Sequence, residues 1–466
     1  MPPRPDPNRF GLKAALAGSD GALMARQGCV PLAALAAGNP LSVAPVSLDG
    51  AHVLVRTSSQ LNAALALVAL DGIAARLVIA PPDLRDEDLA DVISRAGIDT
   101  LVTDGEAIAG LKQVTVSPDL KPAPDCERVR VSEWVMFTSG TSGPPKMVAH
   151  RLAGLTGAII KPGAITPGVT GEKIAPEAIT WGTFYDIRRY GGLQILLRAL
   201  IGGASLVLSE PDEAVADFLT RLGRAGVTHL TGTPSHWRRA LMSPAVARIA
   251  PRYVRLSGEI ADRQILDALK AQFPEAAIGH AYASTEAGVG FEVTDGLEGF
   301  PADFVGRFDA EKRGAVEMKV EGGILRLRSP RTATGYVGGA GQLKADGWVD
   351  SGDMVELRGA RYFFTGRRGG IINVGGLKIN PEEVEAVINR HPGVAQSRVS
   401  SRKNPITGAL VVADVVLADA ANDNATFKES LLALCRAQLP AFKVPTLVRF
   451  VEKLELTAGG KLARHG

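Results

Sequence analysis

Short apolar runs alternate with helix-like segments through the first hundred residues of the chain. The runs at 51–55, 75–79 and 100–103 are apolar, whereas 59–70 and 86–96 carry hydrophobic residues at helical spacing. Short apolar runs are typical of buried strands, and longer periodic segments are typical of helices. Repeated strand–helix units with short turns predict a mostly parallel sheet covered by helices.

The same alternation returns in the middle of the chain. Helices are expected at 214–225, from Ser235 onward, and at 261–273, with strands at 227–230 and 253–256 between them. In sheets of this kind ligands bind beyond the carboxyl ends of the strands. We therefore expect a functional site at that edge.

The pattern changes after about residue 300. Glycines become frequent, and short strands such as 323–328 and 360–364 follow one another, which predicts a β-rich subdomain over about 300–366. This subdomain completes a large N-terminal domain, residues 1–366.

The last hundred residues, 367–466, have the pattern of a compact α+β module. Asn380, Pro381 and Glu383 have the residue types that favour a helix start, and a second helix is expected from Phe427 to Leu439. The fold class predicted is α/β: a large N-terminal domain of helix-covered, mostly parallel sheets with a β-rich subdomain, followed by a small α+β C-terminal domain.

Composition changes this picture little. The 466 residues suffice for two domains, and a net charge of +3 gives no reason to expect nucleic acid or a membrane surface as partner. Three dispersed cysteines predict neither disulfides nor structural zinc. The N-terminus has no apolar core typical of a signal peptide, and the apolar window 61–80 is interrupted by charged residues. We expect a cytoplasmic protein.

One loop, within residues 137–148, stands out chemically. It follows a predicted strand at 134–137 and precedes a predicted helix that starts at His150. Small hydroxyl residues, glycines and a lysine expose backbone N–H groups and a positive charge, which suits a polyphosphate. The spacing is not that of a Walker A loop. A flexible surface loop is the alternative. The candidate phosphate-binding residues are Thr138, Ser139, Gly140, Thr141, Ser142, Gly143 and Lys146.

Further motifs follow in order along the chain. They are Tyr282-Ala-Ser-Thr-Glu286, Gly335-Tyr336, Asp346-Gly-Trp-Val-Asp-Ser-Gly-Asp353, Gly366-Arg367 with the segment Gly376–Glu385, and Leu456-Thr-Ala-Gly-Gly-Lys-Leu-Ala-Arg464. Together with the loop they resemble, in the same order, the motifs of the adenylate-forming superfamily: acyl- and aryl-CoA synthetases, luciferases and peptide-synthetase adenylation domains. The resemblance covers residues 134–464. It implies that a carboxylic acid reacts with ATP to give acyl-AMP and pyrophosphate, and that the acyl group then passes to a thiol.

The resemblance also implies roles for single residues. Glu286 would hold Mg²⁺ between the phosphates, with Thr285 as a hydroxyl donor beside it. Tyr282 would offer a flat face to adenine, while Asp353 and Arg367 would contact the ribose. The full set of residues expected around AMP is Ser257, Gly258, Glu259, Tyr282, Ala283, Ser284, Asp353 and Arg367. For the first three of these, a plain strand-to-helix turn is nearly as good an interpretation.

Lys461 resembles the catalytic lysine that reaches the α-phosphate and the carboxylate oxygen, and it forms the expected catalytic set with Thr285 and Glu286. Three further residues, Gly375, Gly376 and Lys378, lie where CoA ligases build a surface for the pantetheine arm, although a simple β-turn is the alternative. The resemblance implies a mobile C-terminal domain that turns on a hinge after Arg367. Gly369 takes the place of the usual hinge residue, and glycine there permits backbone rotation.

The acyl pocket is the least defined part. Asp186 follows an aromatic residue, Tyr185, as in amino-acid-activating members, where an Asp binds the α-amino group. Counting back from Gly203-Ala204 instead places Arg188 to Tyr190 nearer that position. Arg188 would suit a second carboxylate or a polar aryl acid, and a surface salt bridge is an equal alternative. His236 and Trp237 either contact the substrate or anchor a helix.

These observations favour an ATP-dependent acid:CoA ligase for a small aryl or short acyl carboxylate, using ATP, Mg²⁺ and CoA. The alternative is a free-standing enzyme that loads an aryl or amino acid onto a phosphopantetheinyl carrier protein. We expect a monomer or homodimer with no nucleic-acid or membrane partner.

Overall fold

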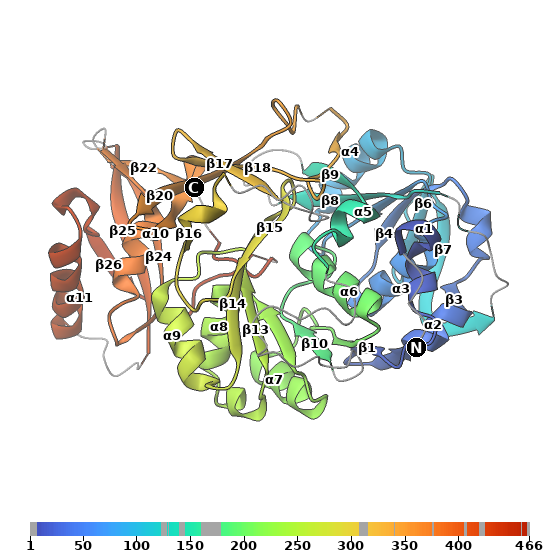
Figure 1. Cartoon of the computed structure of the whole chain (residues 1–466), viewed down its shortest axis with the longest axis horizontal. Coiled ribbons are helices and arrows are strands. Elements are labelled where there is room, and N and C mark those ends of the chain that lie inside the picture. Colours follow the sequence, from blue (N-terminus) through green and yellow to red (C-terminus); the bar gives the residue numbers. More distant parts are fainter. Residues whose placement is uncertain are drawn as a thin grey trace.

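The computed structural model describes residues 7–122, 128, 130–138, 145–159, 179–306, 316–339, 341–374, 377–404, 408–418, 425–457 and 459–463. The described residues form two large sheets, whose strands interleave along the chain, a five-stranded sheet and a smaller C-terminal unit (Figure 1).

The first large sheet has eight strands in the order β19-β9-β8-β5-β4-β6-β7-β3. Strands β5, β4 and β6 run parallel, as the alternating pattern predicts, and β8 joins them parallel to β5. The bounds are β3 Gly38–Leu41, β4 His52–Arg56, β5 Arg76–Ile79, β6 Thr100–Thr103, β7 Lys112–Pro122, β8 Glu133–Thr138, β9 Lys146–Arg151 and β19 Gly335–Val337.

The second large sheet has the order β15-β14-β13-β12-β10-β11-β1-β2. Strands β14, β13, β12, β10, β11 and β1 are parallel, and an antiparallel strand closes each edge. The bounds are β1 Ala22–Ala25, β2 Gly28–Pro31, β10 Thr180–Thr183, β11 Ser205–Val207, β12 His229–Gly232, β13 Tyr253–Ser257, β14 Ala277–Ser284 and β15 Gly288–Val293.

Helices α3 and α6 lie in the hydrophobic core that the two large sheets share. Ten residues of α3 are buried, which explains why its sequence is apolar on all sides. Helices α7, α8 and α9 cover the other face of the second sheet, whereas α4 has an acidic first turn and ends at the left-handed Gly97. The bounds are α1 Pro7–Ala15, α2 Leu32–Ala37, α3 Gln60–Leu70, α4 Asp86–Ala96, α5 Leu152–Thr156, α6 Tyr190–Gly202, α7 Val215–Arg224, α8 Pro234–Leu241 and α9 Arg263–Gln272.

The predicted β-rich subdomain is an antiparallel five-stranded sheet, in the order β16-β21-β20-β18-β17, with its own aromatic-rich core. Its strands are β16 Phe300–Pro301, β17 Glu317–Glu321, β18 Ile324–Arg328, β20 Val349–Arg358 and β21 Arg361–Arg367.

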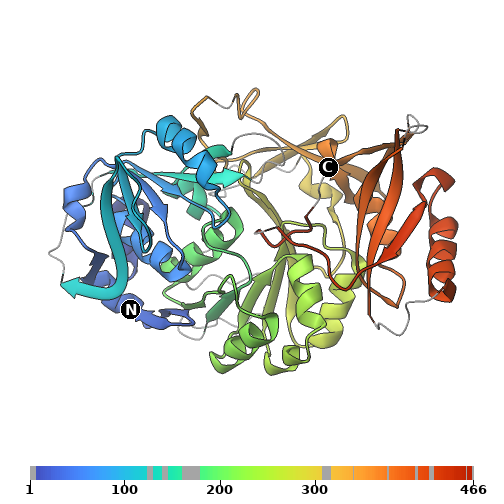
Figure 2. The same cartoon turned by 180° about the vertical axis from the view of Figure 1, so that it is seen from behind.

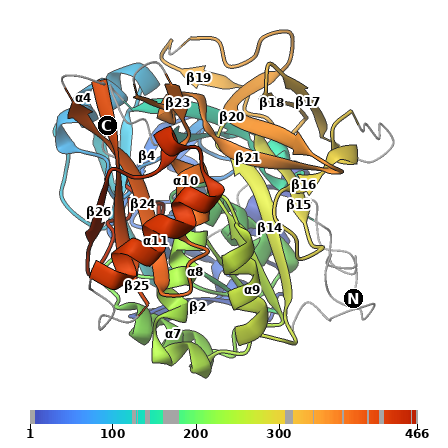
Figure 3. The same cartoon turned by 90° about the vertical axis from the view of Figure 1, so that its left-hand side faces the viewer.

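The C-terminal unit has a separate core, which confirms the predicted α/β fold with a large N-terminal domain and a small α+β C-terminal domain. Figure 3 shows α10 and α11 packed on the strands of this unit. In Figure 2 the segment after β26 turns back to the middle of the molecule. The elements are β22 Ile372–Val374, β23 Leu377–Ile379, α10 Pro381–Ile388, β24 Val394–Asn404, β25 Gly408–Leu417, α11 Ala425–Gln438 and β26 Leu447–Phe450.

Short 3₁₀ turns complete the described elements. They are η1 Pro45–Leu48, η3 Pro244–Arg248, η4 Ala302–Phe304, η5 Arg368–Gly370 and η7 Ala441–Lys443. Within the described part of the chain, no helix has the length and apolar character that crossing a membrane requires.

One element expected from the sequence is wrong. His150 does not start a helix; it lies in β9, and α5 begins at Leu152. The glycine-rich loop therefore joins two antiparallel strands, β8 and β9, in place of a strand and a helix. The reason is long-range: β9 also pairs with β19, almost two hundred residues later, and this pairing outweighs local preference.

Candidate active site

Asp353 is held by two side chains from different strands. The Tyr282 hydroxyl of β14 donates to Oδ2 at 2.6 Å, and Nε of Arg367 on β21 donates to Oδ1 at 2.8 Å. The backbone N–H of Asp353 donates to Ser351 Oγ at 3.0 Å. Burial, then the Asp353 charge, raises the pKa of Tyr282 well above its usual value, so its hydroxyl stays a donor at neutral pH. The carboxylate is thus held in one orientation.

The Tyr282 ring packs against two phenylalanines. It stacks with Phe291 at 5.6 Å and with Phe364 at 5.3 Å between ring centroids. These contacts, together with its hydroxyl bond, fix the ring beside Asp353, although the ring itself stays half-buried. A contact with adenine remains a proposal for this residue.

The C-terminal segment forms a tight turn that presents Lys461. The N–H of Thr457 donates to the Lys461 carbonyl at 2.7 Å, and the N–H of Gly460 donates to the Thr457 carbonyl at 2.8 Å. Gly460 has a φ of +71°, which glycine adopts without strain. The turn is therefore built around a residue that needs to be glycine.

Two residues of the large domain hold this turn in place. Thr233 Oγ1 donates to the Gly460 carbonyl at 2.6 Å, and the Leu462 N–H donates to Glu259 Oε1 at 2.8 Å. Glu259 Oε2 also accepts from the Ser235 N–H at 2.9 Å. Glu259, expected from the sequence near adenine, thus links the end of the chain to helix α8.

Lys461 lies beside Gly258, at the end of β13. A Cβ atom added to Gly258, whose φ is +87°, would sit 3.2 Å from Lys461 Cε. The surrounding protein, then the positive charge of Arg367, lowers the pKa of Lys461, while Glu259 and Asp353 oppose the shift. The ammonium group of Lys461 is therefore close enough to interact with the charges of Asp353 and Arg367, while Lys461 and Arg367 themselves remain exposed to solvent.

Glu286 and Thr285 follow β14, next to the strand that leaves the glycine-rich loop. His150 Nε2 on β9 donates to the Thr285 carbonyl at 2.7 Å, and the Ala333 N–H donates to the Glu286 carbonyl at 2.9 Å. Burial, then the charge of Glu286, raises the pKa of Tyr336 on β19. This places the Glu286 carboxylate near the β9–β19 edge.

Lys146 lies on the same edge. Its Nζ sits 6.0 Å from the centre of the Tyr336 ring, and the residue pairs in register with Thr138 at the mouth of the loop. A lysine, a hydroxyl and a carboxylate thus gather here. Magnesium in phosphate-transfer sites takes one or two carboxylates plus phosphate oxygens, so Glu286 fits such an ion. The described residues contain no group of three or more His, Cys, Asp or Glu arranged for a metal.

Some expected site residues cannot be placed. Five loop residues, Ser139 to Gly143, and the pair Gly375 and Gly376 lie outside the described residues. Lys378 is exposed on β23. Ser284 lies at the end of β14, where its Oγ accepts from the Ala287 N–H at 3.0 Å.

A cavity lies between α6 and the second large sheet, with about 310 Å³ of space free of protein atoms when the adjoining open solvent is included. The Tyr185 hydroxyl, on its wall, donates to the Ser257 carbonyl at 2.9 Å. The residues that line the cavity are Tyr185, Tyr190, Gly191, Gln194, Ile195, Thr231, Arg255, Ser257, Ala283 and Val289. Since Ser257 lies next to Gly258, and Gly258 lies beside Lys461, this cavity is the candidate ligand pocket of the site.

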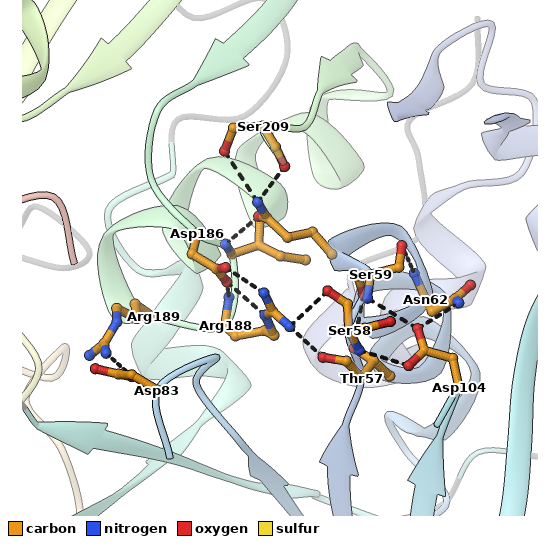
Figure 4. A network of polar contacts seen from close by, with 12 residues as sticks. Thr57, Ser58, Ser59, Asn62, Asp83, Asp104, Asp186, Arg188, Arg189 and Ser209 are labelled. Carbon is orange, nitrogen blue, oxygen red and sulfur yellow. Dashed lines mark hydrogen bonds and ion pairs between the residues drawn. The ribbon is translucent and has the colours of Figure 1, made fainter. Parts of the chain in front are cut away.

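Asp186 and Arg188 form a largely buried ion pair (Figure 4). Neither residue is among those that line the cavity. Arg188 Nη2 donates to Asp186 Oδ2 at 2.6 Å, and Nη1 donates to the carbonyls of Thr57 and Ser58. The Arg188 side chain is 1% exposed. These contacts join segments of the two large sheets. The salt bridge left open by the sequence is therefore present but buried, which corrects its expected surface location, and a substrate contact by either residue stays a prediction. The neighbouring Arg189 pairs with Asp83.

His236 and Trp237 anchor helix α8 and do not line the cavity. His236 forms a capping box with Thr233 and stacks on Phe184 at 5.5 Å. Trp237 is fully buried against Phe273, with 6.1 Å between ring centroids. Of the two interpretations left open by the sequence, the structure supports the anchoring one. Of the expected pocket residues, Tyr185 lines the cavity.

Tyr190, which ends the stretch 188–190 expected near the pocket, lines the cavity, and so do Arg255 and Gln194, which were not singled out from the sequence. One signal was present. Arg255 stands between Val254 and Leu256 in an otherwise apolar strand, where an arginine is rarely buried without a partner.

Three histidines make stability depend on pH. Burial lowers the pKa of His150 and of His229 to about 4 and that of His236 to about 3, whereas an unfolded histidine titrates near 6.5. Between these values the unfolded chain binds more protons, so the free energy of unfolding falls as pH is lowered from about 6.5 towards 4. We expect the melting temperature to fall over this range, and His229→Asn to flatten the slope. A melting temperature that is constant between pH 7 and pH 5 contradicts this.

Comparisons with known proteins agree with this geometry. The family model described as "AMP-binding enzyme" matches residues 48–337, and the "AMP-binding enzyme C-terminal domain" matches residues 383–461. The chain is 28% identical over 385 residues to 2-succinylbenzoate–CoA ligase of Listeria innocua, covering 80% of this chain and 77% of that protein.

Two solved structures share the fold. o-Succinylbenzoate CoA synthetase of Bacillus subtilis, in complex with its acyl-adenylate intermediate, matches with a TM-score of 0.73 at 20% identity, covering 97% of this chain and 96% of that one. An anthranilate CoA ligase in complex with anthranoyl-AMP matches with a TM-score of 0.77 at 16% identity, covering 98% and 96%.

Proposed function

Because the chain belongs to the AMP-binding enzyme family, we propose that it activates a carboxylic acid with ATP and transfers the acyl group to CoA. One observation carries the proposal. Lys461, Asp353 and Arg367, which come from both domains, are close enough for their charges to interact, and Lys461 lies beside Gly258, the residue that follows the pocket residue Ser257. The Listeria relative, a CoA ligase, supports CoA as acceptor.

In the first half-reaction a carboxylate oxygen of the acid attacks the α-phosphorus of ATP, and pyrophosphate leaves. Negative charge builds on the α-phosphate oxygens and on the leaving group in the transition state, so fixed positive charges there accelerate the step. Lys461 is proposed for the first of these sites. Lys146 and the loop hydroxyls are proposed for the second, where Glu286 would hold a magnesium ion that would add positive charge.

In the second half-reaction the thiol sulfur of CoA attacks the acyl carbonyl carbon, and AMP leaves. The contacts that bring Lys461 close to Asp353 and Arg367 also fill the space beside Gly258. We therefore infer that the C-terminal domain turns away before the thiol enters. The boundary proposed for this rotation is 366/367, at the end of β21. A Cβ atom added to Gly369 would meet nothing within 4 Å, so the segment after the boundary has room to move.

The proposal is tested by incubating the purified protein with ATP, Mg²⁺, CoA and a panel of aryl, short acyl, dicarboxylic and amino acids. Pyrophosphate release should depend on the acid, and mass spectrometry should detect the acyl-CoA. Acyl transfer to a phosphopantetheinylated carrier protein, with none to CoA, would support the carrier-loading alternative. Binding of ATP without pyrophosphate release from any acid would contradict both.

Asp353→Asn should weaken ATP binding. The carboxylate is held by Tyr282 and Arg367 in an orientation suited to accept bonds from ribose hydroxyls, and hydrogen bonds to a charged group contribute about 1.5–3 kcal/mol. We expect KM for ATP to rise by about 10- to 100-fold, with little change in KM for the acid. An unchanged KM for ATP would remove Asp353 from the nucleotide site. Asp350→Asn, on the same strand, is the matched control.

A further inference from the structure

Arg95 lies in the last turn of α4, the helix that packs on the face of the first large sheet opposite α3 (Figure 1). Val92 and Ala96, on either side of Arg95 in this helix, share a buried core with Met147 of β9 and Val337 of β19. This core fixes the last turn of α4 against the two strands. The Arg95 side chain is thereby held beside the β9–β19 pair.

The Arg95 guanidinium bonds two backbone carbonyls that belong to different parts of the chain. Nη1 donates to the Pro145 carbonyl at 3.3 Å, and Nη2 donates to the Val337 carbonyl at 3.4 Å. Nη1 also donates to Asp91 Oδ2, one helical turn earlier, at 2.8 Å. A guanidinium carries its donors on a rigid planar fork and so holds two separate acceptors at once, whereas a lysine ammonium is a compact point charge on a flexible stem. Arg95 thus bridges the segment before β9 and the end of β19.

The two carbonyls flank residues of the candidate phosphate site. Pro145 directly precedes Lys146, and Val337 directly follows Tyr336. The register pairs Val337 with Met147 at this end of the ladder, so Lys146 lies where β9 begins to pair with β19. Lys146 Nζ is 6.0 Å from the centre of the Tyr336 ring. Arg95 therefore ties the two strands together at the point where Lys146 enters the sheet.

The chain after β19 fits closely over Arg95. A Cβ atom added to Gly338, whose φ is +76°, would lie 2.7 Å from Arg95 Nε and 2.8 Å from Arg95 Cβ. Because Arg95 Cβ is fixed by the helix backbone, moving the tip of the arginine would not relieve this contact. The Arg95 side chain is 20% exposed, so its bonds to the two carbonyls are largely shielded from water. The arginine is enclosed by the segment that it holds.

We propose that Arg95 is a positioning residue for adenylation, which holds the Pro145 and Val337 carbonyls together and thereby orders Lys146 for the pyrophosphate part of ATP. This inference rests on the proposed function, which gives Lys146 that role. A lysine that binds phosphate loses conformational freedom, and ordering its backbone beforehand lowers this cost. Arg95 acts through Lys146 and makes no contact with ATP in this role.

The reverse reaction isolates the pyrophosphate site. A pyrophosphate oxygen attacks the α-phosphorus of acyl-AMP, the carboxylate leaves, and ATP forms, whereas thioester formation from acyl-AMP and CoA uses no pyrophosphate. The acyl-AMP is that of the best acid from the panel above. Both reactions are measured for the wild type, Arg95→Met, Arg95→Lys and Arg85→Met. Arg85 precedes α4 and pairs with Glu87 and Asp88 at the opposite end of this helix, so it is the matched control.

We expect Arg95→Met to raise KM for pyrophosphate by about tenfold and to leave thioester formation from acyl-AMP unchanged. Arg95→Lys keeps the charge and loses the planar fork, so KM should rise by about threefold. Arg85→Met should match the wild type. An unchanged KM in folded Arg95→Met, or in Arg95→Lys if the methionine variant does not fold, overturns the proposal. A loss of thioester formation equal to the loss of ATP formation also overturns it, because general damage would affect both.

A double variant identifies the group through which Arg95 acts. In the Lys146→Met background, Arg95→Met should raise KM for pyrophosphate by less than about twofold more, because no lysine remains to be ordered. A larger further rise overturns the proposal. Failure of the proposed function looks different: the wild type would then release no pyrophosphate from any acid and form no ATP from acyl-AMP and pyrophosphate.

Discussion

Replacing Lys461 with methionine is expected to lower acid-dependent pyrophosphate release by about a hundred- to a thousandfold, the usual effect of removing one preorganised group that stabilises transition-state charge. The turn from Thr457 to Lys461 presents the ammonium group close to the charges of Asp353 and Arg367. Methionine keeps the length and the apolar stem and removes the positive charge. The effect should therefore appear in kcat, with little change in KM for ATP or the acid.

The two half-reactions separate this role from a structural one. Lys461→Met supplied with preformed acyl-AMP and CoA should still form the thioester at close to the wild-type rate. Lys453→Met, at an exposed lysine in the same C-terminal domain, should behave as wild type in both assays. Pyrophosphate release at the wild-type rate from Lys461→Met would exclude Lys461 from the chemistry.

Much of the architecture follows from local pattern. The strands at β4, β5 and β6 and the helices between them appear in the sequence as short apolar runs and helical spacing, because each element buries a continuous apolar face. The grouping of Tyr282, Asp353 and Arg367 could also be predicted from the sequence, since all three belong to motifs that occur in the family's order. The structure adds that the Asp353 carboxylate accepts hydrogen bonds from the other two side chains.

Long-range contacts account for what local pattern could not give. The residues after the glycine-rich loop form a strand because β19, from a distant part of the chain, completes the sheet beside β9. Asp186 and Arg188 looked like pocket or surface residues because nothing local shows that the carbonyls of Thr57 and Ser58 lie opposite. Arg255 was overlooked because its position on a cavity wall depends on α6 and β15, which the sequence does not place.

Gly460→Ala should impair adenylation almost as strongly as the loss of Lys461. A Cβ atom at this position would lie 1.8 Å from His236 Cε1, and the φ of +71° is unfavourable for alanine. The imidazole has little freedom to move away, because it stacks on Phe184 and caps α8 through Thr233. The turn would have to shift outward and carry Lys461 with it. Since a displacement of about 1 Å can cost about a hundredfold in rate, we expect a decrease of that order in pyrophosphate release.

Two further variants distinguish displacement of the turn from general instability. In Gly459→Ala the new Cβ atom would meet Arg189 Cδ at 3.6 Å, an ordinary contact, so adenylation should change little. In the double variant Gly460→Ala/His236→Ala the clash is relieved and the φ strain remains, so we expect partial recovery of adenylation above the Gly460→Ala rate. Thioester formation from acyl-AMP should be near normal in all three variants, because that step uses the C-terminal domain in its other orientation. Equal losses of adenylation in Gly459→Ala and Gly460→Ala, or no recovery of adenylation in the double variant, would contradict this prediction. Either result would show that the close contact between the turn and His236 does not position Lys461.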